Sequence, residues 1–537
     1  MSDNEGRYGL VRVERALLSV SDKTSLAPFA SFLAQNSVEL ISTGGTFKAL
    51  SEAGLSVRKI SDFTGFPEIL DGRVKTLHPK VEGGLLADWS NQAHAGEAKA
   101  NNIVPIHLIV CNLYPFEKTV ASGAADRDVI ENIDIGGPTM VRAAAKNYKN
   151  TAVVTSPAQY SLVQEELSKN SMGLSLETRE SLARQAFSLT AGYDAAIANW
   201  FESGAPAGGI PQNLFIALKG AAKPKYGENP GQNARVFKTP FNSGGILEWE
   251  QLSGDVPSFN NFMDAGKANK LLQGFEEVPT VATVKHGIIS GFSFATTLSE
   301  AYEKTSKCDP SADFGGVIVM NRACDAKTAE LIADPRPENY REIICAPDFA
   351  PEAVELLKKG QKKQRRLFKT KPYSSYHWDV RLVDGAFLVQ EQPDFGKRLQ
   401  ETAVSFPTKL KPDADALKVL LTAHEVVRKV PSNGILVGDG VVKDGIVESF
   451  WTYGVGSSTK RSRAVQIALE VAGGRARNAI LASDGFFPFP DSVELAGERG
   501  VKAIIQPGGS LRDHLSIQKA DQLGIAMAFS HARIFSH

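Results

Sequence analysis

Basic and polar side chains are concentrated in the stretch DGRVKTLHPK at positions 71–80. Arg73 and Lys75 supply positive charge, and because His78 precedes Pro79 its backbone favours an extended conformation. The spacing therefore predicts an ordered loop with Pro79 as a rigid end. Arginine offers a planar fork for phosphate or carboxylate, and lysine a mobile point charge. On charge alone a solvated basic loop is the commoner structure, but the residues around this stretch favour an anion site.

Two short apolar runs, at 16–20 and 38–41, are predicted strands. The first ends in SDKT and is followed by a helical pattern at 26–33, and the second runs into STGGT before a helix expected to open at Phe47. Such turns present free N–H groups at the carboxyl edge of a parallel sheet, where phosphate binds. One copy would indicate only a capped turn. Two copies followed by Arg73 and Lys75 predict a phosphorylated ligand.

A third group of polar residues follows the apolar strand predicted at 106–112. Tyr114 comes directly after that strand, where ligands collect in open sheets. Asp134 precedes a glycine pair, and Arg142 and Lys146 then share one face of a helix. Two interpretations of Asp134 and Lys146 remain open: a salt bridge from turn to helix, or proton transfer.

The rest of the chain begins after a Gly/Pro-rich, aperiodic segment at 203–211, where we place a domain boundary. A β-rich strand at 280–284 ends directly in Lys285 and His286. By itself a Lys-His pair is more often a chance occurrence than a site.

Length, charge and cysteine content limit the classes of protein to which this chain can belong. The 537 residues predict about three or four domains. Lys plus Arg and Asp plus Glu are both 60, so no net field favours nucleic acid or membrane. We find no apolar run of about 18 residues and no secretory signal. The four cysteines form no C-x-x-C pair, so we expect no zinc site and no disulfide framework, as in a reducing cytoplasm.

The motifs SVSDKT, STGGT, GRVKTLHP, CNLYPF and IDIGGPT with RAAAKN occur in this order and resemble the cyclohydrolase half of a bifunctional purine-biosynthesis family. The family combines aminoimidazole-carboxamide ribonucleotide (AICAR) transformylase with inosine monophosphate (IMP) cyclohydrolase. The resemblance implies an α/β fold, with a methylglyoxal-synthase-like, doubly wound parallel sheet over residues 1–202.

The resemblance implies that this half closes formamido-AICAR (FAICAR) to IMP with loss of water and without a metal. Asp134 and Lys146 would handle the amide proton, and Lys75 and Tyr114 would stabilise the formyl oxygen. The residues implied to hold the nucleotide are Ser19, Lys23, Thr43, Gly44, Gly45, Arg73, Thr76, Asn112 and Gly136.

The segments around Lys285-His286, DGAFLVQ, SDGFFPF and IQPGGS resemble the transformylase half, over residues 213–537 after a linker at 203–212. The resemblance implies two cytidine-deaminase-like α/β subdomains and a cytoplasmic homodimer with transformylase sites at its interface. 10-Formyltetrahydrofolate would be the co-substrate, His286 the base and Lys285 the group that stabilises the oxyanion. The implied ligand contacts are Lys225, Tyr226, Gly315, Glu342, Asn433, Lys460, Phe486, Pro488 and Arg533.

Three departures from the family pattern bear on this half. Gly287–Gly291 replaces an Asn-Pro-x-Gly segment, Lys225 replaces an arginine beside a second change at Gly231, and Gly454–Lys460 stands where Gly-x-Gly-Gln-x-x-Arg is usual. A monofunctional cyclohydrolase with a C-terminal dimerisation and nucleotide-binding module is therefore the alternative. A regulatory nucleotide sensor is a third hypothesis, disfavoured because phosphate binding alone needs neither Asp134 nor Lys146.

Overall fold

The structure, a computed structural model, describes residues 9–203, 209–239, 245–309, 315–334, 340–359, 365–373, 378–392 and 399–537. The chain forms two compact units, Met1–Lys219 with Thr239–Phe241 (unit 1) and Gly220–Lys238 with Asn242–His537 (unit 2). The predicted linker, 203–212, falls within unit 1, and its residues 204–208 lie outside the described ranges.

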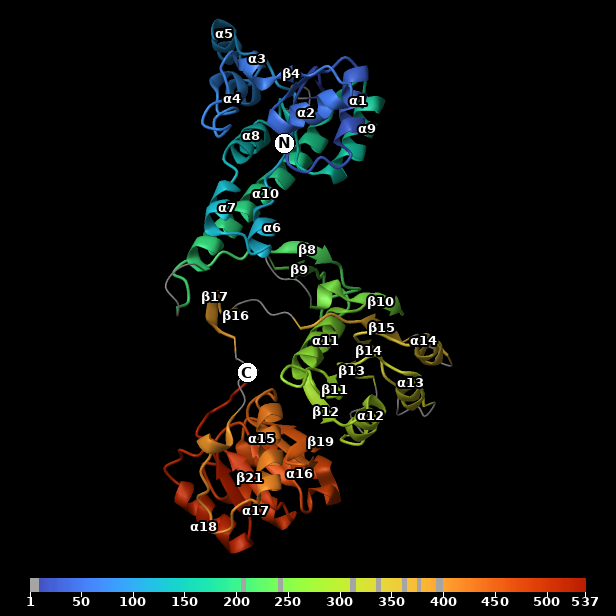
Figure 1. The fold of residues 1–537 in the computed structure, drawn as a ribbon, viewed down its shortest axis with the longest axis vertical. Coiled ribbons are helices and arrows are strands. Elements are labelled where there is room, and N and C mark those ends of the chain that lie inside the picture. The colour runs from blue at the N-terminus through green and yellow to red at the C-terminus, as the bar shows by residue number, and fades with distance from the viewer. Residues whose placement is uncertain are drawn as a thin grey trace. The chain divides into compact units, whose positions relative to one another are not determined.

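Unit 1, coloured blue to green in Figure 1, is built on a five-stranded parallel sheet of order β4-β3-β2-β5-β6. A parallel sheet is what the resemblance implies for this part of the chain. Its strands are β2 (Arg15–Val20), β3 (Glu39–Ser42), β4 (Arg58–Lys59), β5 (Leu108–Asn112) and β6 (Ala152–Val154). The chain adds β3 and β4 on one side of β2 and then returns to add β5 and β6 on the other. In such a sheet the crevice at the carboxyl ends beside the central strand is the usual ligand site. A short β1 (Val11–Arg12) pairs with β7 (Gly173–Leu174) apart from this sheet.

Helices surround this sheet, and most of them supply the rest of its core, while Phe116, Val129, Tyr193 and Ala196 form a smaller separate cluster. The helices are α1 (Leu26–Gln35), α2 (Gly44–Glu52), α3 (Ile60–Thr64), α4 (Pro79–Leu86), α5 (Gln92–Ala100), α6 (Phe116–Ala121), α7 (Asp126–Glu131), α8 (Gly136–Lys146), α9 (Tyr160–Lys169) and α10 (Leu176–Ser203). The helix expected at Phe47 begins earlier, at Gly44. The predicted loop is confirmed for residues 71–78, but Pro79 and Lys80 are not part of it: Pro79 opens α4, with the His78 ring accepting the Lys80 N–H as N-cap. Proline suits the first helical turn because its missing donor would be unpaired there anyway.

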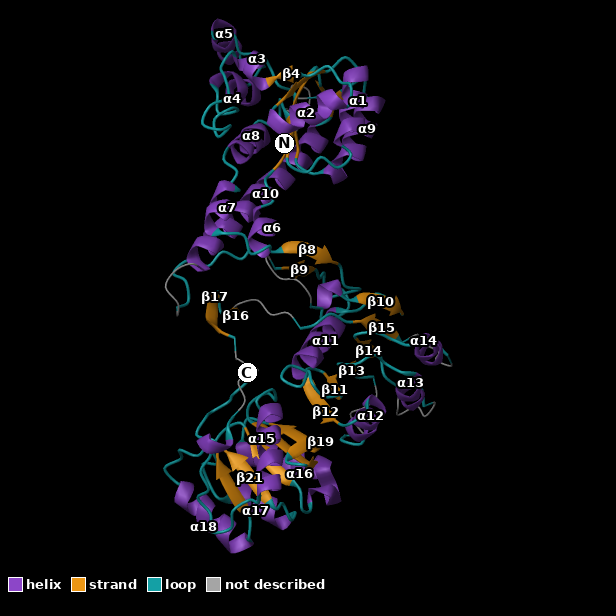
Figure 2. Cartoon of the chain, viewed as in Figure 1, coloured by secondary structure: helices purple, strands orange, loops and turns teal. Residues whose placement is uncertain are grey.

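Unit 2 contains an 11-stranded mixed sheet of order β10-β15-β14-β13-β11-β12-β19-β18-β20-β21-β22, drawn in orange in Figure 2. Its strands are β10 (Glu250–Ser253), β11 (Thr280–Lys285), β12 (Ile288–Phe294), β13 (Val317–Met320), β14 (Ile343–Ala346), β15 (Arg366–Lys369), β18 (Gly434–Lys443), β19 (Ile446–Ser457), β20 (Ile480–Ser483), β21 (Ala503–Gln506) and β22 (Ala526–Phe529). The predicted strand before Lys285-His286 is confirmed as β11.

The order of elements in unit 2 repeats. A helix, a β-hairpin and three further helix–strand steps run from α11 to β15, and the same order runs from α15 to β22. The helices are α11 (Phe259–Leu271), α12 (Leu298–Ser306), α13 (Ala326–Ile332), α14 (Pro351–Lys358), α15 (Ala414–Val427), α16 (Arg461–Ala472), α17 (Asp491–Glu498) and α18 (Asp513–Leu523). The two copies join where β12 pairs with β19.

The helices of unit 2 lie on both faces of its sheet. α11 and α15 bury their apolar residues in one core that spans both repeats, including Ala268 and Leu420. On the other face α12 to α14 and α16 to α18 form separate cores, one for each repeat. α11 begins at Phe259, where Ser258 and Asn261 form a capping box.

Two smaller sheets complete the described chain. One is the hairpin of β16 (Trp378–Val383) and β17 (Ala386–Glu391), and the other pairs β8 (Lys219–Ala222) with β9 (Val236–Lys238). Within the described ranges, no helix has the length and apolar character needed to cross a membrane.

Candidate functional site

A cavity of about 650 Å³ lies at the carboxyl ends of β2, β3 and β5 in unit 1. Most residues predicted for the N-terminal site line it: Ser19, Lys23, Thr43, Gly45, Arg73, Lys75, Thr76, Asn112, Tyr114, Asp134 and Gly136. Their positions follow from the sheet, because parallel strands end at a common edge and the loops after them converge.

The predicted STGGT turn meets a cation here. Gly44, with φ of 34°, opens α2, and Lys75 Nζ lies 3.8 Å from where a Cβ on Gly44 would stand. Ser19 Oγ and Thr43 Oγ1 share a hydrogen bond of 2.8 Å that joins the ends of β2 and β3. Free amides at a helix N-terminus beside a lysine and hydroxyl groups form an arrangement suited to phosphate.

The glycine pair at the start of α8 lets two polar side chains approach the helix closely. A Cβ on Gly136 would lie 2.6 Å from Thr76 Oγ1, and one on Gly137 would lie 2.6 Å from Asp134 Oδ2. Asp134 Oδ1 accepts the Gly137 N–H at 2.8 Å. The glycines are therefore required for space.

Burial raises the pKa of the Asp134 carboxyl above its ordinary value, while hydrogen bonds from Gly137 and Tyr114 and the Lys75 ammonium act to lower it. A carboxyl with a raised pKa is a stronger proton acceptor when it is ionised. Tyr193 of α10 braces the same turn: its hydroxyl accepts the Asp134 N–H at 2.8 Å and donates to Asn132 O at 3.1 Å.

Other predicted residues have different surroundings. Arg73 pairs with Glu131 of α7 at the cavity. The Asn112 side chain accepts the N–H groups of Ser21 and Asp22 at 2.7 and 2.9 Å, so it also holds the loop after β2.

The structure does not bring Lys146 to this site. It is the last residue of α8, exposed, about 15 Å along the helix axis from Gly136. Lys146 and Asp134 are both among the described residues. Lys146 does not line the cavity, and no ion pair joins it to Asp134. The prediction that Arg142 and Lys146 lie on one helix is confirmed. Asp134, however, contacts the first turn of that helix, whereas Lys146 is its last residue.

The residues predicted for the C-terminal site lie at one edge of the large sheet. Strand directions and registers place five strand ends there: Lys285, Val317, Ile343, Gly434 and Ser483. Gly315 and Glu342 precede β13 and β14, Asn433 precedes β18, and Phe486 and Pro488 follow β20. Arg533 follows β22, which is parallel to β21 and β20. The fold thus collects, from both repeats, residues far apart in the chain.

Lys285 and His286 end β11 at a two-residue turn. Lys285 is half-buried and His286 exposed, and His286 and Gly287 have φ of 51° and 74°. Asp264 of α11 accepts both amides of the turn. The N-terminal end of the same helix contacts the loop that contains Lys225 and Tyr226, since the Phe259 N–H donates to Tyr226 O at 3.2 Å. The Lys225 ammonium lies 3.9 Å from the Asp255 carboxylate.

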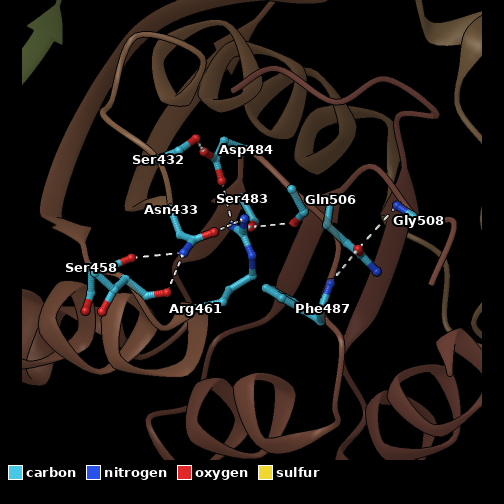
Figure 3. A network of polar contacts seen from close by, with 11 residues as sticks. Ser432, Asn433, Ser458, Arg461, Ser483, Asp484, Phe487, Gln506 and Gly508 are labelled. Atoms are coloured by element: carbon cyan, nitrogen blue, oxygen red, sulfur yellow. Dashed lines mark hydrogen bonds and ion pairs between the residues drawn. The ribbon is translucent and has the colours of Figure 1, made fainter. Parts of the chain in front are cut away.

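A polar network joins the strand ends of the second repeat (Figure 3). Arg461, 7% exposed, donates to Asn433 Oδ1 at 2.6 Å, Asp484 Oδ1 at 2.6 Å and Ser483 Oγ at 2.8 Å. The Asn433 amide donates to Ser458 O at 2.9 Å and to Thr459 O at 3.2 Å. Lys460 is exposed. The cation of this segment that enters the network is thus Arg461, one residue beyond the predicted Lys460.

The C-terminal residues pack against this network. Ile534 N–H donates to Asp484 O, and Ser432 N–H donates to Ser536 O. The Arg461 and Arg533 guanidinium groups lie 6.0 and 5.6 Å from the Phe535 ring centre. Arg533 is therefore near Asn433 through contacts that no local pattern shows.

The remaining predicted contacts are half-buried or engaged. Phe486 and Pro488 flank the fully buried Phe487, whose N–H donates to Gln506 Oε1 at 3.2 Å (Figure 3). Glu342 Oε1 accepts from Arg366 at 2.7 Å, and Gly315 N–H donates to Tyr340 O at 2.7 Å.

No cluster of three or more His, Cys, Asp or Glu suited to a metal ion occurs among the described residues. Sequence reasoning missed Tyr193, Asp264 and Arg461. Of these three, only Arg461 could have been found from the sequence, because it directly follows Gly454–Lys460, the segment that ends in an arginine in the family.

Comparison with known proteins gives concordant matches. A family model described as the AICARFT/IMPCHase bienzyme matches residues 144–471, and a model of the MGS-like domain matches residues 25–139. The "Bifunctional purine biosynthesis protein PurH" of Halalkalibacterium halodurans is 42% identical over 97% of this chain and 99% of its own. Those of Thermoanaerobacter sp. and Acetivibrio thermocellus are each 43% identical, over 98% of this chain and 100% of their own.

A solved chain described as "Crystal structure of ForH" is 35% identical and covers 35% of this chain and 99% of its own, with a TM-score of 0.32 too low to carry a structural argument. The full-length similarity and both domain matches show that the chain belongs to the AICARFT/IMPCHase bienzyme family, with an MGS-like domain preceding the larger part.

Proposed function

We propose that the chain catalyses two consecutive steps of purine nucleotide synthesis. Formyl transfer from 10-formyltetrahydrofolate to AICAR gives FAICAR, and FAICAR then closes to IMP with loss of water. The observation that carries this proposal is the presence of two separate sites on two units. One is the cavity around Lys75 and Asp134, and the other is the edge that gathers Lys285, His286 and Asn433.

In unit 1 the reacting groups belong to one molecule, so the site must orient them and move protons. The carboxamide nitrogen attacks the formyl carbon, and the ionised Asp134 carboxylate accepts the N–H proton. The Lys75 ammonium and the Tyr114 hydroxyl stabilise the formyl oxygen as it gains charge. This oxygen takes up the carboxamide proton from Asp134 and the formamide N–H proton, and it leaves as water as the ring C=N bond forms. Ser19, Lys23, the Thr43–Gly45 turn, Arg73 and Thr76 hold the phosphate and ribose. Lys146 receives no step because of its distance.

In unit 2 the attacking amine is a weak nucleophile because its lone pair is delocalised into the imidazole ring. His286 accepts its proton, and Lys285 stabilises the tetrahedral oxyanion. As the oxyanion collapses, the bond to the folate nitrogen breaks and that nitrogen takes up the proton held by His286. Asn433, Phe486 and Arg533 contact the ligands, together with Lys225, Tyr226, Gly315, Glu342, Lys460 and Pro488. Folate is the co-substrate, and neither step requires a metal.

We further propose a cytoplasmic homodimer in which each repeat of unit 2 is a cytidine-deaminase-like subdomain. The β16–β17 hairpin supports the dimer, since Leu382 and Phe387 are paired across it and are 70% and 66% exposed. An isolated hairpin with an apolar face is marginally stable in water and gains from a partner surface.

The second candidate function is cyclisation alone, with unit 2 as a dimerisation and nucleotide-binding module. The Asn433 side chain favours it, because both its oxygen and its nitrogen are engaged by Arg461, Ser458 and Thr459. A ligand would have to displace one of these bonds to use it.

The test supplies AICAR and 10-formyltetrahydrofolate to the purified chain, and follows tetrahydrofolate release and IMP formation separately. We expect both, and we expect His286→Ala to lower the rate of release by roughly a hundredfold or more, to a residual rate, while added FAICAR is still cyclised. Cyclisation without release by the wild-type chain would favour the second candidate. Failure to cyclise FAICAR would refute the assignment of unit 1.

A further inference from the structure

We propose that Asp264 is a positioning residue that holds His286 where it accepts the amine proton, an inference that rests on the proposed formyl transfer. Asp264 touches no reacting group; it acts through the backbone of the turn that carries His286. Nothing in the spacing of the sequence connects the two residues, which lie on different elements, α11 and the β11–β12 turn.

The turn has the geometry of a type I′ hairpin. Two residues, His286 and Gly287, join β11 to β12, and both have positive φ, 51° and 74°. Type I′ turns require positive φ at both positions and favour Asn-Gly or Asp-Gly. Histidine at the first position is tolerated at positive φ but is not among the Asn, Asp and Gly residues that these turns prefer.

The chain itself shows what this turn ordinarily contains. Asp384-Gly385 joins β16 to β17 with φ of 42° and 77°, and Asp444-Gly445 joins β18 to β19 with φ of 51° and 75°. Both use the preferred Asp-Gly pair. At the corresponding place after β11, histidine stands instead of aspartate, so a requirement other than turn formation selects it.

A buried carboxylate compensates for that choice. Asp264 is 9% exposed; its Oδ1 accepts the Gly287 N–H at 2.7 Å and its Oδ2 accepts the His286 N–H at 3.1 Å. Hydrogen bonds to an ionised acceptor are strong, and more so away from water. Both amides of the turn are thereby fixed on α11, whose Ala265 and Ala268 are packed in the shared core.

The same helix approaches the turn with a second side chain. Lys267 Nζ lies 2.5 Å from where a Cβ on Gly287 would stand, so only glycine fits at that position with Lys267 as it lies. Gly287, which departs from the family pattern, is thus part of a turn that contacts α11 through both Asp264 and Lys267. With its backbone fixed, the exposed His286 ring faces solvent at the sheet edge where the other candidate residues gather.

Asp264→Asn tests the proposal, since the amide has a similar shape but lacks the charge and accepts through only one atom. We expect kcat for formyl transfer to fall at least tenfold with KM for AICAR changed less than threefold. Cyclisation of FAICAR should be unchanged. Asp444→Asn, in the matched turn at the opposite edge of the sheet, should leave kcat and KM at wild-type values.

A double variant separates positioning from a general loss of structure. If Asp264 acts through His286, adding Asp264→Asn to His286→Ala lowers the residual rate no further. Multiplicative losses, or wild-type kcat in Asp264→Asn, would overturn the proposal. If transfer by Asp264→Asn is undetectable, calorimetric AICAR binding decides: retained affinity supports a misplaced base, and lost affinity overturns it.

Hydrogen exchange of peptides covering 284–290 gives a readout independent of activity. We expect faster exchange of the His286 and Gly287 amides in Asp264→Asn, and unchanged protection would overturn the proposal. This measurement also distinguishes the two levels of inference. A wild-type chain without formyl transfer refutes the proposed function, whereas exchange still shows whether Asp264 holds the turn.

Discussion

At the scale of single residues, burial sets the proton affinity of carboxyl groups that lack strong partners. Glu82, on α4, has a buried Oε1 without a hydrogen-bond partner. Burial raises the pKa of this carboxyl from 4.5 to about 7. Asp134 shows the same direction, moderated by two amides and a lysine. The two carboxyl groups differ in location, because Asp134 lines the cavity and Glu82 does not.

Glu82→Gln should stabilise unit 1 at pH 8. The folded chain holds the Glu82 proton more tightly than the unfolded chain, so the contribution of this group is fully present below about pH 4.5 and is lost as pH rises through about 7. Glutamine stays neutral, so the decline in melting temperature between pH 5 and pH 8 should flatten.

Circular-dichroism melting over that pH range measures the effect, and cyclohydrolase activity remaining after heating assigns it to unit 1. The exposed Glu97→Gln, on the neighbouring α5, is the matched control and should keep the wild-type pH dependence. Identical profiles for Glu82→Gln and the wild-type chain would contradict the prediction.

Tyr193→Phe should lower kcat for cyclisation by roughly tenfold. Removing the hydroxyl leaves the Asp134 N–H without its acceptor, which costs about 1–3 kcal/mol in a buried place, and each 1.4 kcal/mol is about a factor of ten in rate. Formyl transfer should be unaffected.

Steady-state cyclisation of FAICAR measures this loss. Tyr160→Phe is the control, because the Tyr160 hydroxyl is also buried but has no hydrogen-bond partner, so its removal should leave kcat unchanged. Equal rates in both variants would show that Tyr193 only fills space.

At the scale of elements, close contact between a helix and the sheet explains the two glycines of the Gly454–Lys460 segment. A Cβ on Gly454 would lie 2.1 Å from Ala468 O, and one on Gly456 would lie 2.1 Å from Ala464 O. The two glycines of β19 therefore let α16 lie directly on the sheet. Because Arg461 is the first residue of α16, this packing also sets where its guanidinium meets Asn433.

Gly456→Ala should destabilise unit 2 by about 1–3 kcal/mol, because the methyl group forces α16 off the sheet. It should also raise KM for AICAR, since Arg461 moves with the helix. Chemical denaturation and transfer kinetics measure the two effects. Gly474→Ala is the control: a Cβ there meets nothing within 4 Å, and stability should be unchanged or slightly higher. Equal denaturation midpoints would contradict the packing argument.

At the scale of the whole molecule, two units with separate cores carry two sites with different demands. The proposed cyclisation site lies at the carboxyl edge of one parallel sheet, where the loops after β2, β3 and β5 line a single cavity. The proposed transfer site lies on a duplicated sheet: the two copies join where β12 pairs with β19, and this pairing brings the last residue of β11 and the first residue of β18 to one edge. This separation is why loss of one activity in a variant can be measured against the other as an internal control.

The sequence alone determined the local parts of this protein. Hydrophobic periodicity indicated β2, β3, β5 and β11, and hydroxyl and glycine turns after strands indicated a phosphate site. Both signals are properties of neighbouring residues, so they need no knowledge of the fold. Thr43 and Lys75 were identified in this way, whereas the roles expected of Asp134 and the Lys285-His286 pair came from the resemblance to the family.

The tertiary structure alone decided which distant residues meet. Sheet order and register are long-range properties, and they bring Asp264 to the His286 turn, Arg461 to Asn433, and Tyr193 to Asp134. They also separate Lys146 from Asp134, because α8 begins at the cavity and carries its last residue away from it. Local spacing gives the type of a side chain and its face; only packing gives its partner.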